Sequence, residues 1–300
     1  MKNESRRVLF IVNKHAGTGY QPQVEGRMID ISEKNDVECT IEFTQGPGHA
    51  TDLAKDGIAK GFDFIVAVGG DGTINEVAQG LVHSSTSMGI IPRGSGNGLS
   101  RHLGIPLKIS DAIQSLYTSA PLGMDTFLVN GKLSLNVSGI GFDGHIANLF
   151  GGKTKRGLAG YAKLTLKEFL QFNEFEAKVT IDGKTIDTSA FIIAIANSSQ
   201  YGNNARIAPA ASVCDQLLHI SVVRKVPMYR LDVVYEVFKG DIERSPFCEI
   251  YTGRSIQIKT TQDVPYHVDG EPSGHYNAFT IDVQPCSLNV LAPLANGKIR

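Results

Sequence analysis

Short apolar runs alternate with amphipathic stretches through the first third of the chain. The expected strands are Val8–Val12, Val37–Phe43, Phe64–Val68 and Met88–Ile91, and the expected helices cover Ala50–Lys60 and begin at Thr73 and after Asn97. Strands separated by helices of this length predict a mainly parallel sheet covered by helices, which is an α/β domain.

The pattern changes after about Asp125, where β-type runs replace the helical spacing. The expected strands are Phe127–Val129, Leu133–Val137, Glu176–Ile181, Phe191–Ala196, Leu217–Val223, Ser255–Ile258 and Thr280–Val283. Asn130-Gly131 and Asp182-Gly183 separate neighbouring runs, and such dipeptides are typical of two-residue hairpins. We therefore expect a second, antiparallel β domain.

Composition narrows the function classes without selecting one. The chain has 300 residues, with 29 basic and 30 acidic side chains and a net charge of −1. This balance argues against a dedicated nucleic-acid-binding protein, which normally has a strong basic excess. The four cysteines are scattered and no apolar run approaches the length of a membrane span. We expect a cytoplasmic protein.

Glycine-rich segments that follow strands carry the candidate chemistry. They are Asn13–Gly19, Thr44–Ala50, Gly69–Asn75 and Pro92–Leu99. Ligands bind at the carboxyl ends of strands in open α/β sheets, and a glycine turn before a helix suits a phosphate group. Asp71 lies inside the Gly69–Asn75 turn, where a carboxylate can hold Mg²⁺. A structural strand-to-helix turn is the alternative for any one of these segments.

The order of these four segments resembles the diacylglycerol kinase catalytic-domain family, which includes YegS-like lipid kinases, bacterial diacylglycerol kinases and sphingosine kinases. The resemblance continues through Asp125, Gly139–Asp143, Asp215–Leu218 and Val268–Glu271. It implies an α/β nucleotide-binding domain over residues 1–127, to which residues 286–300 return, and a β-sandwich lipid-substrate domain over residues 128–285. It also implies ATP, Mg²⁺ and phosphorylation of a lipid hydroxyl.

The resemblance also implies the roles of individual residues. The nucleotide contacts are Asn13, Gly17, Thr44, Gly69, Gly70, Gly72, Thr73, Asn75 and Ser95. Asp71 is the Mg²⁺-linked carboxylate, Asp125 an acidic member of the same network, and Glu271 the general base. A second metal site would use Asp215 with Ser212 and Leu217.

The sequence departs from the family pattern at two places. Gly98 stands where many bacterial members carry Asp, so one acidic residue of the network is absent. Gln216 and His219 replace a Gly and an Asp beside Asp215, which leaves the second metal site open.

Two other functions compete with a lipid kinase. An NAD kinase shares the turn Gly69–Thr73, and a nucleotide-binding regulatory protein would need no turnover. The Gly94–Leu99 segment and Asp269–Glu271 favour the lipid kinase. The expected partners are a nucleotide and a lipid substrate at a membrane surface, with peripheral association, and a homodimer is left open. The basic residues Lys153, Lys155, Arg156, Lys163 and Lys167 form either a solvated face or a contact with anionic headgroups.

Overall fold

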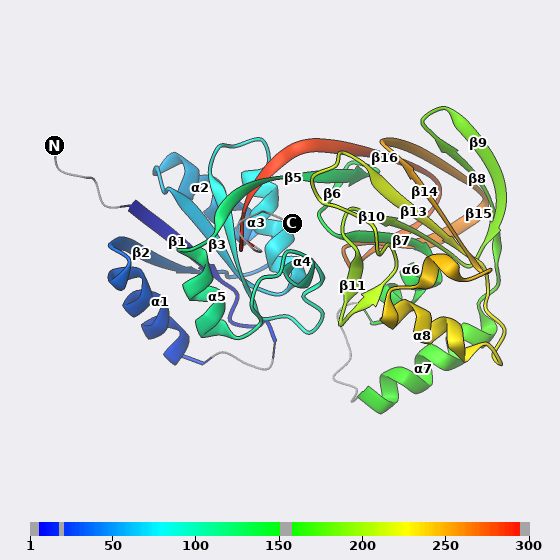
Figure 1. The fold of residues 1–300 in the computed structure, drawn as a ribbon, viewed down its shortest axis with the longest axis horizontal. Helices are drawn as coiled ribbons and strands as arrows, with labels where there is room; N and C mark the ends of the chain where they lie inside the picture. Colours follow the sequence, from blue (N-terminus) through cyan, green and yellow to red (C-terminus); the bar gives the residue numbers. More distant parts are fainter. Residues whose placement is uncertain (1–5, 18–20, 151–157, 295–300) are drawn as a thin grey trace. The chain divides into compact units, whose positions relative to one another are not determined.

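The computed structural model describes residues 6–17, 21–150 and 158–294 (Figure 1). Lys153, Lys155 and Arg156 of the basic run lie outside these ranges. The chain divides into two compact units, Met1–Asp125 with Pro285–Arg300, and Thr126–Gln284. Both boundaries fall inside strands, β5 (Ala120–Val129) and β16 (Glu271–Ala292). The chain therefore passes between the units twice, each time in extended conformation.

The first unit is built on a parallel sheet. Its strands are β1 (Arg6–Val12), β2 (Val37–Phe43), β3 (Phe64–Gly69) and β4 (Ser87–Pro92). They lie in the order β4-β3-β1-β2, and the end of β16 joins beside β4 through the parallel pair Val290 and Met88. β3 is buried along its whole length, as expected of a central strand covered on both faces.

Helices cover both faces of this sheet. They are α1 (Gln23–Lys34), α2 (His49–Ala59), α3 (Asp71–Leu81), α4 (Gly98–His102) and α5 (Ile109–Leu116). α2 packs against α3 on one face, and α1 packs against α5 on the other (Figure 1). The hydroxyl groups of Ser32 and Tyr117 are 2.6 Å apart and join α1 to the end of α5.

The second unit consists of antiparallel strands. They are β6 (Lys132–Ser134), β7 (Val137–Gly141), β8 (Phe175–Ile181), β9 (Lys184–Ala190), β10 (Ile192–Ala196), β13 (Leu218–Val223), β14 (Cys248–Gly253) and β15 (Ser255–Val268), with a small ribbon of β11 (Gln200–Gly202) and β12 (Ala205–Arg206). One set has the order β14-β13-β10-β7-β15, and the other joins β9 and β8 to β15.

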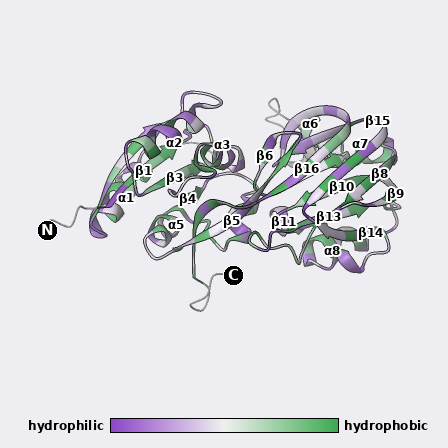
Figure 2. Cartoon of the chain, turned by 90° about the horizontal axis from the view of Figure 1, so that it is seen from above, coloured by the Kyte–Doolittle hydropathy of each residue, from purple (hydrophilic) through white to green (hydrophobic). Residues whose placement is uncertain are grey.

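The long strand β15 belongs to both sets and forms the corner between them. Its first half, through Thr260, pairs with β8, whereas Tyr266 and His267 pair with β7. The register against β16 shifts between Lys259 and Val264, which lets the strand turn from one set to the other. Apolar side chains from both sets share one buried core, in which Ile220 and Ile256 lie. Green marks the hydrophobic residues along these strands in Figure 2.

Helices complete the second unit. They are α6 (Phe142–Phe150), α7 (Leu158–Gln171), α8 (Leu231–Lys239) and the short 3-10 helix η1 (Ile242–Arg244). The rings of Phe142, Phe169, Phe172 and Phe191 pack together and fix α7 to the start of α6 and to the strand region. Within the described ranges, the chain has no helix that could span a membrane.

One expected strand is wrong. The run Leu133–Val137 predicts a single strand, but β6 ends at Ser134 and β7 begins at Val137. The backbone N–H groups of Leu135 and Asn136 donate instead to the carboxylate of Asp269, at 2.8 and 3.0 Å. This side chain replaces the strand-to-strand hydrogen bonds at the break, so the two short strands follow different partners.

Candidate functional site

In the first unit, the candidate site lies where the sheet order reverses. The chain passes from β1 to β2 on one side and then to β3 on the other, so the crevice between the carboxyl ends of β1 and β3 is the expected ligand position. Asn13 follows β1 directly. Its backbone N–H donates to the Val68 carbonyl at 3.0 Å, and its Nδ2 donates to Thr73 Oγ1 at 3.0 Å. These bonds hold the two loops together at this edge.

The α3 helix begins at the same edge, with Gly70 as its N-cap residue. Because Gly70 has no side chain, no side-chain hydrogen bond caps the start of α3. The N–H groups and the dipole of a helix N-terminus attract phosphate. Thr73 is buried, and a Cβ built on Gly69 would lie 2.5 Å from its Oγ1. Glycine is therefore required at position 69 for packing of the loop. The Thr73 side chain packs against Gly69 and accepts the hydrogen bond from Asn13.

Asn97 organises the turn after β4, a role that the sequence pattern does not predict. Asn97 has a left-handed backbone, with φ of 50°, and its side chain bonds both the N–H and the carbonyl of Gly94, at 2.9 and 2.8 Å. Its own N–H donates to Asp71 Oδ2 at 3.1 Å. Gly70 and Gly94 pack backbone against backbone, because a Cβ on Gly70 would lie 3.2 Å from the Gly94 Cα. Asp71 thus joins the third and fourth glycine-rich segments, Gly69–Asn75 and Pro92–Leu99.

The remaining predicted nucleotide contacts lie around these turns. The N–H of Thr44 donates to the Val12 carbonyl at 3.0 Å, which places Thr44 beside the end of β1. Gly17 has φ of 73°, and a Cβ there would lie 2.2 Å from the Arg93 carbonyl oxygen. Asn75 accepts a hydrogen bond from Gln79 on α3, and Ser95 is exposed in the turn after β4. Gly72 is half-buried in the first turn of α3.

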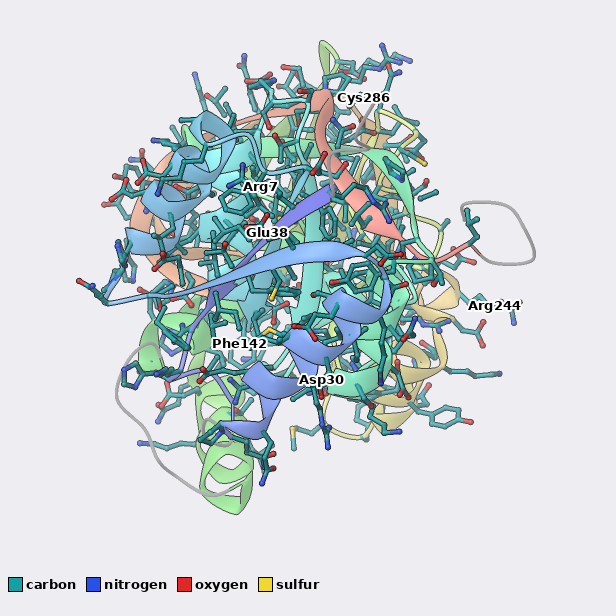
Figure 3. The ribbon with its side chains drawn as sticks, turned by 90° about the vertical axis from the view of Figure 1, so that its left-hand side faces the viewer. Arg7, Asp30, Glu38, Phe142, Arg244 and Cys286 are labelled. Carbon is teal, nitrogen blue, oxygen red and sulfur yellow. The ribbon has the colours of Figure 1, made fainter. Side chains whose placement is uncertain are left out.

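Asp125 is fully buried in the first unit. Its Oδ1 accepts the backbone N–H of Cys286 at 2.7 Å, where β16 returns to the parallel sheet (Figure 3). A buried carboxylate needs such donors, and this bond ties the outgoing strand β5 to the returning strand. The structure therefore gives Asp125 a clear role in joining the two crossing strands.

In the second unit, Glu271 stands at the start of β16, directly after a two-residue turn. Asp269 and Gly270 have φ of 49° and 87°, and Val268 pairs with Glu271 across the hairpin. Positive φ at both positions is typical of a type I′ turn, for which Asp-Gly is favoured. The Asp269 carboxylate accepts hydrogen bonds from Ser134 Oγ, Leu135 N and Asn136 N, at 2.7 to 3.0 Å. The exposed side chain of Glu271 is thus carried on a firmly held turn.

Three further polar residues, Asp143, Tyr201 and His267, lie under this turn, and the sequence pattern predicts no role for them. Asp143 Oδ2 accepts the hydroxyl of Tyr201 at 2.8 Å and faces His267 Nε2 at 3.4 Å. His267 Nδ1 accepts the N–H of Gly270 at 3.0 Å. Burial raises the pKa of Tyr201 well above its usual value, and the neighbouring Asp143 raises it further, so the phenol stays a donor.

The residues predicted to form a second metal site have local partners. The exposed Asp215 accepts the N–H of Leu217 at 3.0 Å through its Oδ1, next to Gln216 with φ of 62°. Ser212 Oγ lies 3.5 Å from Cys214 Sγ. Within the described residues, no group of three or more His, Cys, Asp or Glu side chains is arranged to hold a metal ion. The second site stays a prediction.

The first-unit residues fit a nucleotide phosphate with its metal. The N-terminus of α3 lies at the switch point between β1 and β3, and Asp71 stands in its first turn. Mg²⁺ that accompanies a nucleotide is held by one or two carboxylates together with phosphate oxygens and water. Asp71 is the carboxylate that could supply this contact.

Family models of known proteins match both halves of the chain. A family model described as the diacylglycerol kinase catalytic domain matches residues 7–129, and one described as the YegS C-terminal NAD kinase beta sandwich-like domain matches residues 137–292. The Chromohalobacter salexigens protein named "Probable lipid kinase YegS-like" is 26% identical over 292 residues, covering 95% of this chain and 92% of that protein. The diacylglycerol kinase of Bacillus subtilis (strain 168) is 24% identical over 278 residues, covering 90% and 91%.

A solved structure has a similar fold over almost the whole chain. The crystal structure of a candidate diacylglycerol kinase from Bacillus anthracis str. Sterne has a TM-score of 0.79 and 25% identity, and the match covers 97% of this chain and 98% of that one. The expected fold class, an N-terminal α/β domain followed by a β-sandwich-like domain, is confirmed. The chain belongs to the diacylglycerol kinase and YegS-like lipid kinase family.

Proposed function

We propose that this protein is an ATP-dependent lipid kinase that phosphorylates a lipid hydroxyl at a membrane surface. The observation that carries the proposal is the arrangement at the sheet switch point. There, the N-terminus of α3 meets the loop after β1 through the Asn13–Thr73 bond, with Asp71 in its first turn. In a chain of the lipid kinase family, this is the group of residues suited to a nucleotide phosphate.

The first unit would bind the nucleotide. Phosphoryl transfer depends mainly on positioning and on neutralising charge, and a metal ion bound to the phosphates contributes most of that neutralisation. Asp71 would hold the ion, while Gly17, Gly69–Asn75, Thr44 and Ser95 would line the nucleotide. The Asn97 N–H donates to Asp71 Oδ2 and helps to orient the carboxylate.

Glu271 would act as the general base in the second unit. It takes the proton from the substrate hydroxyl as the oxygen forms its bond to the γ-phosphorus, and the bond from that phosphorus to the ADP oxygen breaks. An exposed carboxylate on a rigid turn is suited to this step, because the base must reach the substrate yet keep its position. Asp125 would remain a structural part of the same network through its bond to Cys286.

Apolar side chains on the second unit support action at a lipid surface. We define the apolar face by three exposed residues, Leu166 and Leu170 on α7 and Met228 on the segment after β13. Each is 46% to 56% exposed, and Leu170 and Met228 line the same groove. Exposed apolar side chains that lie together mark interaction sites, and a lipid kinase must contact a membrane interface to reach its substrate.

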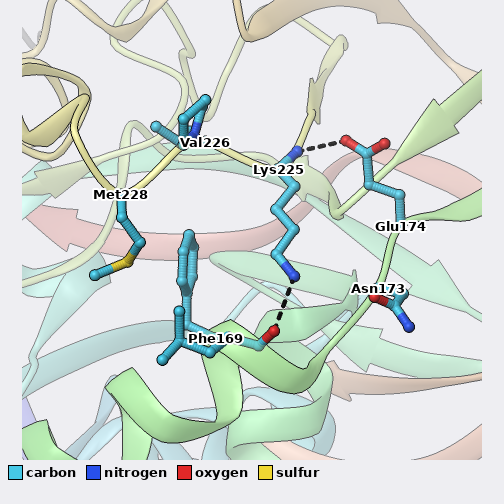
Figure 4. Close-up of a pocket in the computed structure, with 8 residues that line it drawn as sticks. Phe169, Asn173, Glu174, Lys225, Val226 and Met228 are labelled. Carbon is cyan, nitrogen blue, oxygen red and sulfur yellow. Dashed lines mark hydrogen bonds between the residues drawn. The ribbon is translucent and has the colours of Figure 1, made fainter.

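A shallow groove lies within this face (Figure 4). Leu170, Pro227 and Met228 are among its lining residues. Lys225 lies along it, and its Nζ donates to the Leu170 and Phe172 carbonyls at 3.3 and 2.5 Å, at the carboxyl end of α7. This cation caps the carboxyl end of the helix. Leu166 and Leu170 are exposed on the same helix, whereas Phe169 packs against Phe191.

The acceptor assay tests this proposal. The protein is incubated with labelled ATP, Mg²⁺ and, in parallel, micellar diacylglycerol, micellar sphingosine, NAD or no acceptor. We expect label in the organic extract of one lipid reaction. Label on NAD alone would favour the NAD kinase alternative, and nucleotide binding without transfer to any acceptor would favour a regulatory protein. Either result would overturn the proposal.

A further inference from the structure

The buried polar residues beneath the Asp-Gly turn form a connected path. Tyr201 donates to Asp143 Oδ2, Asp143 faces His267 Nε2, and His267 Nδ1 accepts the Gly270 N–H. Gly270 is the residue directly before Glu271. The three side chains come from β11, α6 and β15, so the path joins three separate elements to a single backbone amide.

The hydrogen bonds fix the state of the imidazole ring. Because Nδ1 accepts from Gly270, the proton of the neutral ring stands on Nε2, where it faces the Asp143 carboxylate. The side chain of His267 is 4% exposed and that of Asp143 is 14% exposed, so water does not compete freely for these contacts. The carboxylate orients the ring, and the ring orients the turn.

Two glycines near Asp143 leave the space that its carboxylate and its helix occupy. A Cβ built on Gly139 would lie 1.7 Å from Asp143 Oδ2. A Cβ built on Gly144 would lie 2.5 Å from the Pro265 carbonyl oxygen, on the strand that carries His267. Glycine at both positions therefore lets Asp143 lie directly against β7 and lets α6 approach β15.

We propose that Asp143, His267 and Tyr201 are positioning residues that hold the Asp269–Gly270 turn and, through it, set the place of Glu271. This inference rests on the proposed function, because it gives Glu271 the role of base. Asp269 holds one side of the turn through the loop at residues 134–136, and His267 holds the other side through the Gly270 amide. Both nitrogens of the His267 ring have partners within the chain, the Gly270 N–H and the Asp143 carboxylate.

Substitutions at His267 separate positioning from stability. His267→Phe keeps the ring volume and removes both nitrogens, whereas His267→Asn restores an acceptor near the Nδ1 position. We expect His267→Phe to lower kcat at least tenfold with the KM for ATP changed less than twofold, and His267→Asn to recover most of that loss. The exchange rate of the Gly270 amide, measured by NMR, should rise in His267→Phe and fall again in His267→Asn.

A second pair of substitutions removes only one hydroxyl each and tests the proposal even if the His267 variants do not fold. Tyr201→Phe removes one hydroxyl at the far end of the path, and we expect kcat to fall about threefold and Gly270 exchange to rise. Tyr251→Phe is the matched control, because Tyr251 also donates to a carboxylate, Glu249, but on the edge strand β14. It should change neither quantity.

The outcomes separate the two proposals. If the wild-type protein phosphorylates lipid but the His267 and Tyr201 variants keep the wild-type kcat and Gly270 exchange, the positioning role is wrong. If the wild-type protein transfers phosphate to no lipid, the proposed function fails, and Gly270 exchange alone decides whether His267 holds the turn. Unchanged exchange in His267→Phe would then overturn the inference.

Discussion

Asp71 combines a structural bond with the charge that a metal requires. Its Oδ2 accepts the Asn97 N–H, a bond that the amide oxygen of Asn could also accept. Asp71→Asn should therefore leave the melting temperature within a few degrees of the wild type. Because an amide cannot replace the negative charge, we expect kcat to fall roughly 10²-fold or more, as a metal contact contributes several kcal/mol to the transition state. Near-normal turnover at ordinary Mg²⁺ would remove Asp71 from the metal site.

His102, at the end of α4, predicts a pH dependence of stability. Burial lowers its pKa from 6.5 to about 4. The unfolded chain therefore takes up a proton below pH 6.5, whereas the folded protein does so only near pH 4. The contribution of the neutral ring is complete above pH 6.5 and is lost as the pH falls toward 4, by on the order of 2 kcal/mol.

Urea unfolding of the wild type and of His102→Gln checks this prediction. Carboxylates titrate in both proteins, so the difference between their free energies of unfolding isolates the histidine. We expect that difference to change by about 2 kcal/mol between pH 7 and pH 4.5. Two curves that stay parallel over this interval would contradict the assignment.

At the scale of elements, the spacing of apolar residues and the length of the runs predicted the parallel strands of the first unit well. They predicted the antiparallel strands of the second unit less well. β2 covers the predicted residues Val37–Phe43, and β3 extends the predicted run by Gly69 alone. The break after β6 could not be predicted, because it depends on Asp269, more than 130 residues away. α7 was also missed, since its packing depends on distant rings such as Phe191.

Two glycines on helices give a matched prediction at this scale. Gly26 is exposed on α1 and has no atom within 4 Å of a Cβ built on it, so Gly26→Ala should raise the free energy of unfolding by about 0.5–1 kcal/mol. Gly144 on α6 meets the Pro265 carbonyl, so the same change there should lower it by about 1–3 kcal/mol. Urea titration measures both, and equal effects of the two variants would contradict the packing described for α6.

At the scale of the whole molecule, the candidate site could be predicted in part. The glycine turns and Asp71 follow strands that the pattern places correctly, and the pairing of Asn13 with Thr73 brings two of them together. The positions of Asp143 and His267 could not be predicted from spacing, because 124 residues separate two side chains that lie 3.4 Å apart. Only the folded sandwich brings α6 to β15.

The exposed leucines of the apolar face lead us to expect binding to lipid vesicles. Replacing Leu166 and Leu170 together by serine removes two exposed apolar side chains from α7. We expect binding to anionic phospholipid vesicles, measured by sedimentation, to weaken about 30-fold, since each of the two leucines loses on the order of 1 kcal/mol of partial burial in lipid. Leu107→Ser is the control, because Leu107 is also exposed but belongs to the first unit. Equal vesicle binding by all three proteins would contradict a membrane role for this face.

The measurement that tests the central claim most directly is the turnover of Glu271→Gln with ATP and micellar lipid. Gln keeps the size of the side chain but cannot take the proton from the substrate hydroxyl at neutral pH. We predict that kcat falls about 10²- to 10⁴-fold while the Kd for ATP, measured by calorimetry, is unchanged. A Glu271→Gln protein that phosphorylates lipid within twofold of the wild-type kcat would contradict the account.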